Sequence, residues 1–144
     1  MKYTEEKGDL FSSTAETSLT HCISEDCVMG KGIAVRFKTK FQGVNQLKQQ
    51  VADGKLTGTA AVLKRGDRFV YYLITKKKYW QKPTYTSLRA SLTDMKLHCQ
   101  ENSVTKVAMP KIGCGLDGLN WKKVEPMIQE VFQDTDIHIT VYYL

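Results

Sequence analysis

The stretch MPKIGCGLDGLNW, residues Met109–Trp121, places three glycines and one aspartate between a strand-like and a helix-like segment. Gly113, Gly115 and Gly118 permit positive φ and let the backbone approach a ligand without a Cβ clash. Successive amides can then point at an anion, and a helix that begins behind the loop adds a partial positive field. The stretch is therefore either a set of plain turns or a phosphate-binding loop.

The three glycines have the spacing G-x-G-x-x-G, which is typical of dinucleotide-binding proteins. That fingerprint is expected in the first strand–helix unit, with a ribose-binding acid about 20 residues further on. Here the glycines lie near the C-terminal end, which argues against a dinucleotide-dependent dehydrogenase. The chain also has no GxxxxGK[ST] sequence, so it carries no Walker A loop.

A second glycine-containing loop, His21–Ala34 (HCISEDCVMGKGIA), has the same organisation. It leaves a strand-like segment, carries Gly30 and Gly32, and enters a helix-like segment at Ile33. In sheets with helices between the strands, ligands bind where strand ends meet helix starts. We therefore expect both loops at one edge of the sheet.

The rest of the chain alternates strand-like and helix-like segments, with no internal repeat or linker. Strands are expected at 17–23, 59–64, 68–75, 104–109 and 137–143. Helices are expected at 32–41, 43–52, 84–100 and 121–132. The sequence RGD between the second and third strands predicts a hairpin turn. This order predicts one α/β domain over 1–144, a three-layer α/β/α arrangement around a mixed sheet.

Two polar residues are expected to begin helices, and one proline is expected to disturb a helix. Thr84 and Asn120 precede helical segments, where their side chains can accept a bond from an orphan amide. Pro126 removes a backbone donor, so it should kink its helix or delay its start.

Composition fits an ordinary globular protein, with 42% hydrophobic and 25% charged residues. The formal net charge of +6 fits an anionic partner such as a nucleotide, a nucleic acid or a phosphorylated ligand. A solvated basic surface without a partner is the alternative. No apolar run approaches the length of a membrane span, so no membrane partner is expected.

The four cysteines favour reduced thiols rather than a disulfide framework, because the polar residues 1–7 are not a secretory signal. We therefore expect an intracellular protein, in the nucleus or the cytoplasm or both. Cys22 and Cys27 are separated by four residues, but Cys99 and Cys114 do not complete a second paired half-site. No metal ion is predicted.

Lys76 and Asp117 are the candidates for chemistry. Lys76 ends an apolar strand and is followed by two more lysines, which favour a neutral, nucleophilic amine. The alternative is a solvated lysine run. Asp117 is either a turn residue or a general acid/base that can also hold a sugar hydroxyl. Asp9 could accept a bond from a ligand amine or form an Asx-turn.

The remaining candidates are weaker. No Ser-His-Asp spacing supports Ser24 as a nucleophile. The histidines His21, His98 and His138 all look structural.

Five segments, in this order and covering nearly the whole chain, resemble the macrodomain family. They are KGDLF (7–11), HCISEDCVMGKGIAVRFKTKF (21–41), YYLITKK (71–77), KPTY (82–85) and MPKIGCGLDGLNW (109–121). More narrowly, they resemble the branch of terminal ADP-ribose protein glycohydrolases, also called O-acetyl-ADP-ribose deacetylases. The resemblance implies a single macrodomain with a mixed, mostly six-stranded central sheet.

The resemblance also implies an ADP-ribose site that needs no cofactor. Asp9 would contact the adenine amine. The other binding residues would be Leu10, Ile23, Ser24, Gly30, Gly32, Ile33, Ala34, Ile112, Gly113, Cys114, Gly115 and Leu116. Lys76 and Asp117 match the catalytic pair of the branch. Lys76 would attack the anomeric carbon of the distal ribose and form a lysyl-ADP-ribose intermediate, with Asp117 assisting proton transfers.

The implied activity is the removal of ester-linked ADP-ribose from acidic side chains and the deacylation of O-acetyl-ADP-ribose. The implied partners are ADP-ribose, O-acyl-ADP-ribose and mono- or poly-ADP-ribosylated proteins. The protein itself is expected to be a monomer. A non-catalytic ADP-ribose reader and a hydrolase of ADP-ribosylated nucleic acid remain alternatives. Many hydrolytic macrodomains carry asparagines in the first loop, where this chain reads HCISEDC. That departure favours the lysine route over water activation.

Overall fold

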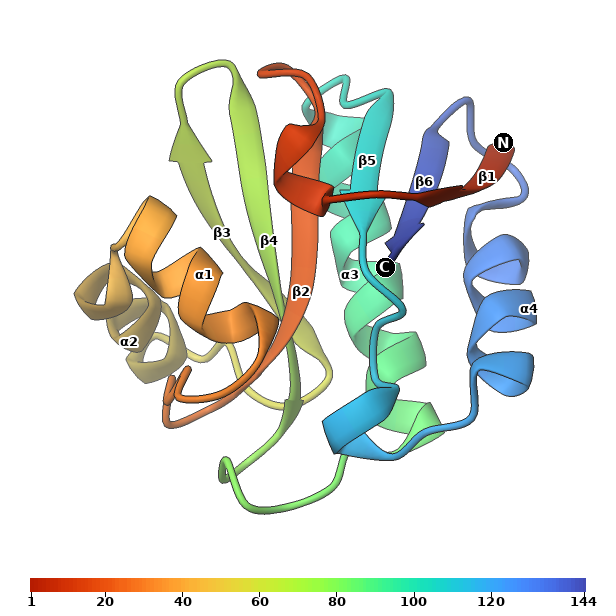
Figure 1. The fold of residues 1–144 in the computed structure, drawn as a ribbon. Helices are drawn as coiled ribbons and strands as arrows, with labels where there is room; N and C mark the ends of the chain where they lie inside the picture. The colour runs from red at the N-terminus through yellow and green to blue at the C-terminus, as the bar shows by residue number, and fades with distance from the viewer.

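A computed structural model describes all 144 residues, and it shows one six-stranded sheet with helices on both faces (Figure 1). The strands are β1 (Lys2–Lys7), β2 (Ser18–Ser24), β3 (Thr59–Arg65), β4 (Arg68–Lys76), β5 (Lys106–Met109) and β6 (His138–Tyr143). The helices are α1 (Ile33–Phe41), α2 (Val44–Ala52), α3 (Tyr85–Glu101) and α4 (Trp121–Phe132). Two short 3-10 helices, η1 (Leu10–Ser12) and η2 (Gly115–Asp117), follow β1 and β5.

The sheet has the order β1-β6-β5-β2-β4-β3, and every neighbouring pair is parallel except β3 and β4. Those two strands form the expected hairpin, in which Arg65 pairs with Arg68 across a two-residue turn. Gly66 in that turn has φ +63°, a conformation that favours glycine. The sheet is therefore mixed, as predicted.

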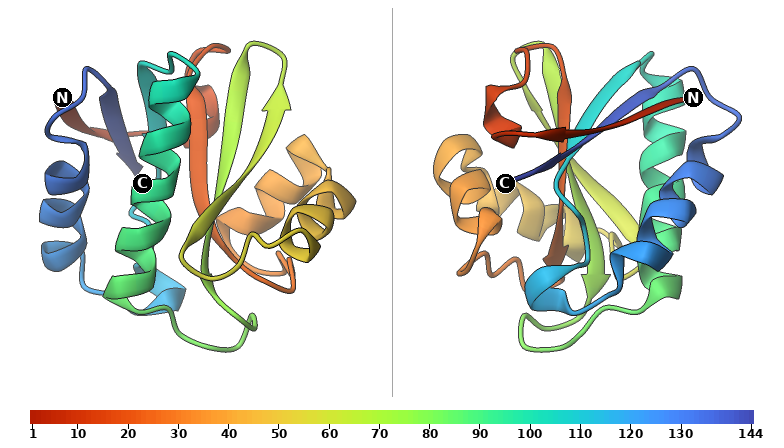
Figure 2. Two further views of the ribbon diagram at one scale, coloured as in Figure 1. Left: turned by 180° about the vertical axis from the view of Figure 1, so that it is seen from behind. Right: turned by 45° about the vertical axis from the view of Figure 1, so that its right-hand side comes forward.

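Alternating side chains of β4 serve two separate cores, because successive residues of a strand point to opposite faces. Tyr71 and Leu73 pack on the face covered by α3 and α4, whereas Tyr72 and Ile74 pack on the face covered by α1 and α2. Figure 2 shows the two helix layers on opposite sides of the sheet. The three-layer α/β/α prediction is confirmed.

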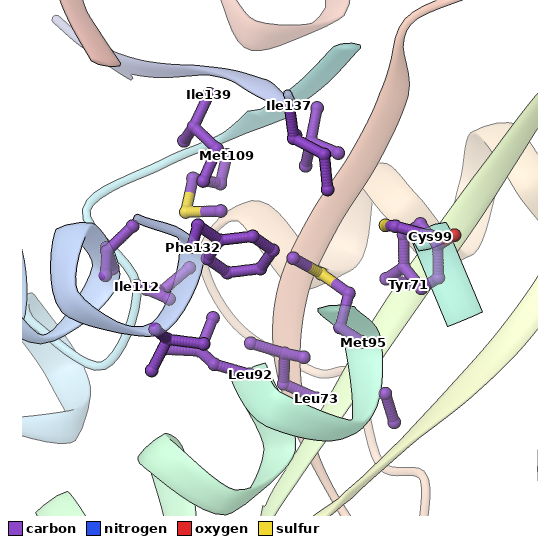
Figure 3. Close-up of a cluster of buried hydrophobic side chains, with 14 of the residues drawn as sticks. Tyr71, Leu73, Leu92, Met95, Cys99, Met109, Ile112, Phe132, Ile137 and Ile139 are labelled. Carbon is purple, nitrogen blue, oxygen red and sulfur yellow. The ribbon is translucent and has the colours of Figure 1, made fainter. Parts of the chain in front are cut away.

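The larger core lies between the sheet and the helices α3 and α4 (Figure 3). Phe132 at the end of α4 is fully buried there, close to Met95 of α3 and to the strand residues Met109 and Ile139. Truncation of a buried aromatic side chain costs about 3–5 kcal/mol. This core fixes α4, and hence the end of the loop that precedes it.

Local signals set the starts of α3 and α4. The Thr84 hydroxyl accepts a bond from the Ser87 amide at 3.0 Å, and the Ser87 hydroxyl accepts one from the Thr84 amide at 3.1 Å. Asn120 caps α4 by accepting from the Lys122 amide at 2.9 Å. Both cap predictions are confirmed. The expectation that Pro126 would delay the start of α4 is wrong, because that helix runs from Trp121 through the proline.

The polar N-terminal segment forms an additional edge strand, which none of the sequence patterns predicted. β1 pairs with β6 along its whole length, from Lys2 with His138 to Lys7 with Tyr143. Its residues are mostly exposed, so no hydrophobic alternation marks it in the sequence. None of the helices is long and apolar enough to cross a membrane.

The histidines occupy the structural positions that were expected. His21 is buried in the α1/α2 face and stacks on Phe37 with 3.9 Å between ring centroids. Neither of its ring nitrogens has a hydrogen-bond partner, and burial lowers its pKa to about 3. His98 is bonded to the Tyr71 hydroxyl at 2.8 Å, and His138 to Thr4 at 3.0 Å.

Candidate active site

The ends of three neighbouring strands, β5, β2 and β4, bring the two glycine loops and Lys76 to one edge of the sheet. The loop after β2 leads to α1 on one face, and the loop after β5 leads to α4 on the other. Such a divergence of connections is where ligands bind in open α/β sheets. Both loops therefore border one site, as the sequence predicted.

Lys76 and Asp117 meet at this edge. Lys76 Nζ lies 2.8 Å from Asp117 Oδ1, and the two side chains are only 13% and 21% exposed. An irregularity in the β2–β4 pairing places Ser24 opposite Lys76 and skips Thr75. Irregularities of this kind redirect a side chain at the end of a strand. A carboxylate thus lies within proton-transfer distance of the amine.

The second loop holds its glycines in the left-handed region, with φ +72° at Gly113, +75° at Gly115 and +79° at Gly118. A Cβ on Gly113 would lie 2.9 Å from a methyl of Leu119, whereas one on Gly115 would meet nothing within 4 Å. The amides of Gly115 and Leu116 donate to no acceptor of the chain. This loop is therefore a shaped stretch of backbone with free donors, not only a set of turns.

The first loop faces the second. Gly32 precedes α1 with φ +60°, and a Cβ there would lie 3.7 Å from Leu116 of the second loop. No side chain caps α1, so the first amides of this helix remain available to an anion. Ile33 and Ala34 form its first turn and are partly buried, whereas Gly30 is exposed just before it.

Asp26 links the first loop to the segment that follows Lys76, and sequence reasoning missed it. Its carboxylate accepts bonds from the Ser24 hydroxyl, the Val28 amide at 3.3 Å and the Tyr79 amide at 3.0 Å. Burial would raise the pKa of Asp26, but these bonds and the charge of Lys78 outweigh it, and the pKa is lowered. The spacing Ser-x-Asp, which is typical of local side-chain turns, was the available signal.

Ser24 itself is buried and bonded to Asp26, and His21 lies in the core away from any catalytic partner. The arrangement contains no serine–histidine pair. Burial and the nearby charge of Asp117 raise the pKa of Cys22 to about 12, which favours the protonated thiol over the nucleophilic thiolate. All four cysteines are free.

Asp9 lies beside α1 rather than free in solution. Its carboxylate accepts two bonds from Arg36, at 3.1 and 2.9 Å, and one from the Phe11 amide at 3.0 Å. The Arg36 bonds, followed by the Phe11 amide, lower the pKa of Asp9. The Asx-turn alternative is realised here, and both carboxylate oxygens also accept from the guanidinium of Arg36, which lies in the first turn of α1. No sequence signal had pointed to Arg36. Leu10 is buried next to it.

Ile23 and Ile112 are buried beneath the site, and Cys114 lies in the second loop with its amide bonded to Lys111. The two isoleucine side chains therefore pack beneath the loops, and the Cys114 amide closes a turn within the second loop. A surface depression of about 590 Å³ lies elsewhere, where α1 meets α2, and contains none of the predicted residues.

Comparisons with known proteins identify the family and the fold of this chain. Residues 15–128 match the family model described as Macro domain. The chain is 59% identical over 138 residues to the ADP-ribose glycohydrolase OARD1 of Bos taurus and of Homo sapiens, covering 96% of this chain and 89% of each relative. It is 30% identical to a DNA ADP-ribosyl glycohydrolase of Thermus aquaticus, over 94% of this chain and 39% of that protein.

Solved structures share the fold. The macrodomain of Thermus aquaticus DarG superposes with a TM-score of 0.88 at 26% identity, covering 99% of this chain and 98% of that one. Thermosipho africanus DarTG in complex with ADP-ribose gives a TM-score of 0.82 at 22% identity, covering 96% and 41%. The sequence resemblance is confirmed, and the chain belongs to the macrodomain family.

Proposed function

We propose that this macrodomain is an ADP-ribosyl hydrolase that removes ester-linked ADP-ribose from acidic side chains and deacylates O-acetyl-ADP-ribose. The observation that carries the proposal is the Lys76–Asp117 pair, 2.8 Å apart and largely buried where the two glycine loops meet. The high identity to ADP-ribose glycohydrolases supports it. Both residues that the proposed chemistry needs are present in this chain.

The proposed reaction begins with proton transfer from the Lys76 ammonium to Asp117, which leaves a neutral amine. The amine attacks the anomeric carbon of the distal ribose, and the bond from that carbon to the ester oxygen breaks. The acidic side chain leaves as a carboxylate with the bonding electrons. Ring opening of the lysyl adduct gives a Schiff base. Water adds to its carbon, protons return to the amine, and ADP-ribose is released.

The backbone would hold the substrate in register for that attack. The free amides of Gly115 and Leu116 and the uncapped start of α1 are suited to the two phosphates of ADP-ribose. Ser24, held by Asp26, would border the distal ribose. Fixing the reacting carbon near Lys76 lowers the entropic part of the barrier.

The test is turnover of a glutamate-ADP-ribosylated peptide by variants of the pair. Lys76→Ala is expected to abolish release of ADP-ribose, because no other amine contacts Asp117. Asp117→Asn should slow release by about 100-fold or more, the usual contribution of a positioned acid/base. The matched control is Lys106→Ala, an exposed lysine at the start of β5 and so at the opposite edge. Full activity of Lys76→Ala would rule out the lysine route.

The covalent step has its own assay. Borohydride added during turnover should reduce the Schiff base to a stable amine, and mass spectrometry should find the ADP-ribosyl adduct on the peptide that contains Lys76. Turnover without any adduct at Lys76 would refute the covalent step while leaving the hydrolase intact. Binding of ADP-ribose without turnover of any ester would instead identify a reader.

A second candidate is release of ADP-ribose from nucleic acid. It is favoured by the excess of basic residues, 21 against 15 acidic, and by the relative named DNA ADP-ribosyl glycohydrolase. Rates on an ADP-ribosylated oligonucleotide and on the modified peptide, measured side by side, separate the two substrates.

A further inference from the structure

An exposed pair of aromatic rings lies directly after the candidate nucleophile. Residues 77–82, here called the aromatic turn, read KKYWQK and follow Lys76 at the end of β4. Tyr79 is 54% exposed and Trp80 is 66% exposed. Large aromatic side chains that stay in water beside a site are unusual enough to indicate contact with a partner.

The aromatic turn is held in shape by its backbone rather than by its rings. The Tyr79 amide donates to Asp26, and the Lys78 amide donates to the Gln81 side chain at 2.9 Å. Lys82 Nζ donates to the Leu116 carbonyl of the second loop at 2.6 Å. The two rings contact each other edge to face, with centroids 5.3 Å apart, and pair with no other aromatic ring. The backbone that carries the rings is thus held in place, and both rings remain more than half exposed.

The charged residues of the aromatic turn itself are all basic. Lys77, Lys78 and Lys82 flank the two rings, and the aromatic turn contains no acidic residue. The nearby carboxylate of Asp26 is occupied by bonds from Ser24 and two amides. Ring faces for stacking combined with ammonium groups for phosphates are what an unpaired nucleic-acid strand requires. An acidic peptide would use the lysines but leave the ring faces unoccupied, and the bases of a duplex are already stacked on one another.

We propose that the aromatic turn docks an unpaired strand of nucleic acid, with bases on Tyr79 and Trp80 and phosphates on the flanking lysines. Tyr79 is three positions after Lys76, so their Cα atoms are at most about 11 Å apart. A nucleotide that carries ADP-ribose on such a strand would therefore lie close to the reacting amine. This last consequence rests on the proposed hydrolase function, whereas docking of the strand does not.

The experiment measures binding of fluorescent, unmodified 15-mers of oligo-dT and oligo-rU by anisotropy at low and at moderate salt. The double variant Tyr79→Ala/Trp80→Ala is expected to weaken binding by about 5- to 150-fold for each base that loses its stacking. A Lys77→Ala/Lys78→Ala variant should weaken binding and reduce the salt dependence. Lys38→Ala/Lys40→Ala on α1 is the control with equal charge loss and should bind with a smaller change.

The outcomes separate this proposal from the hydrolase. Ring-dependent binding of either strand supports the aromatic turn, and the ratio of the two affinities distinguishes DNA from RNA. Unchanged binding in the ring variant, or no binding by the wild type at low salt, overturns it. Turnover of O-acetyl-ADP-ribose by the ring variant should equal that of the wild type. Such turnover shows that the ring variant is folded. If the wild type itself did not turn over O-acetyl-ADP-ribose, that result would count against the proposed hydrolase and not against the aromatic turn.

Discussion

Two glycines of the second loop should respond differently to the same added methyl group. Gly113 and Gly115 have nearly equal φ, +72° and +75°, so an alanine at either position meets the same left-handed backbone penalty of about 1–2 kcal/mol. Only at Gly113 would the new Cβ also collide, at 2.9 Å from Leu119 and 3.2 Å from Leu88. Repacking of that contact adds about 1–3 kcal/mol.

Thermal unfolding should therefore rank the two variants. With about 2.1 cal/mol/K of unfolding entropy per residue, a loss of 1 kcal/mol in this chain lowers Tm by about 3 °C. Gly115→Ala is expected to lower Tm by about 3–6 °C, and Gly113→Ala by about 6–15 °C. A Gly113→Ala protein as stable as Gly115→Ala would refute the packing argument, and two variants with the stability of the wild type would refute the left-handed geometry.

Gly115→Ala, the variant expected to lose less stability, is expected to lose affinity for ADP-ribose. The methyl group of Gly115→Ala enters open space in front of the free amides, where the diphosphate is expected. Loss of one bond from an amide to a charged group costs about 1.5–3 kcal/mol, which is about 10- to 150-fold in affinity for ADP-ribose. Calorimetry on the folded variant measures this loss. Unchanged affinity in Gly115→Ala would mean that the loop does not hold the ligand.

Three further predictions concern separate parts of the molecule. If Asp9 accepts a bond from the adenine amine, the wild type should prefer ADP-ribose over the inosine analogue that lacks this amine, and Asp9→Ala should erase the preference without removing binding. Asn120→Ala should lower the free energy of unfolding by about 1 kcal/mol in urea, while Asn120→Asp, which keeps an acceptor at the cap, should not. The buried, neutral His21 has a pKa lowered to about 3, so stability is complete above pH 6.5, where the unfolded histidine is also neutral, and falls as the pH decreases toward 3. Between pH 4.5 and 6, His21→Leu should reduce the slope of unfolding free energy against pH by up to about 1.4 kcal/mol per pH unit, and an unchanged slope would contradict the assignment.

Much of the architecture followed from local patterns. The apolar run of β4, the caps at Thr84 and Asn120 and the two-residue turn at Gly66 are properties of short segments, and the structure has each of them. β1 was not predicted from the sequence, because an edge strand of mostly exposed residues carries no hydrophobic alternation. The delayed start expected from Pro126 did not occur, because loss of one donor is tolerated where the rest of the helix is held by a buried face.

The sequence by itself determined the segments that form the four helices and the strands β2 to β6, that two glycine loops exist, and, through resemblance, that Lys76 and Asp117 belong together. Only the tertiary structure brought those two residues, 41 positions apart, to 2.8 Å, because strand order decides which loops share an edge. It also decided that the Tyr79 amide donates to Asp26 and that Arg36 binds Asp9. These contacts join residues that are far apart in the sequence, and the residues next to each of them give no indication of its partner. They form only when hydrophobic packing on both faces of the sheet sets the distance between elements.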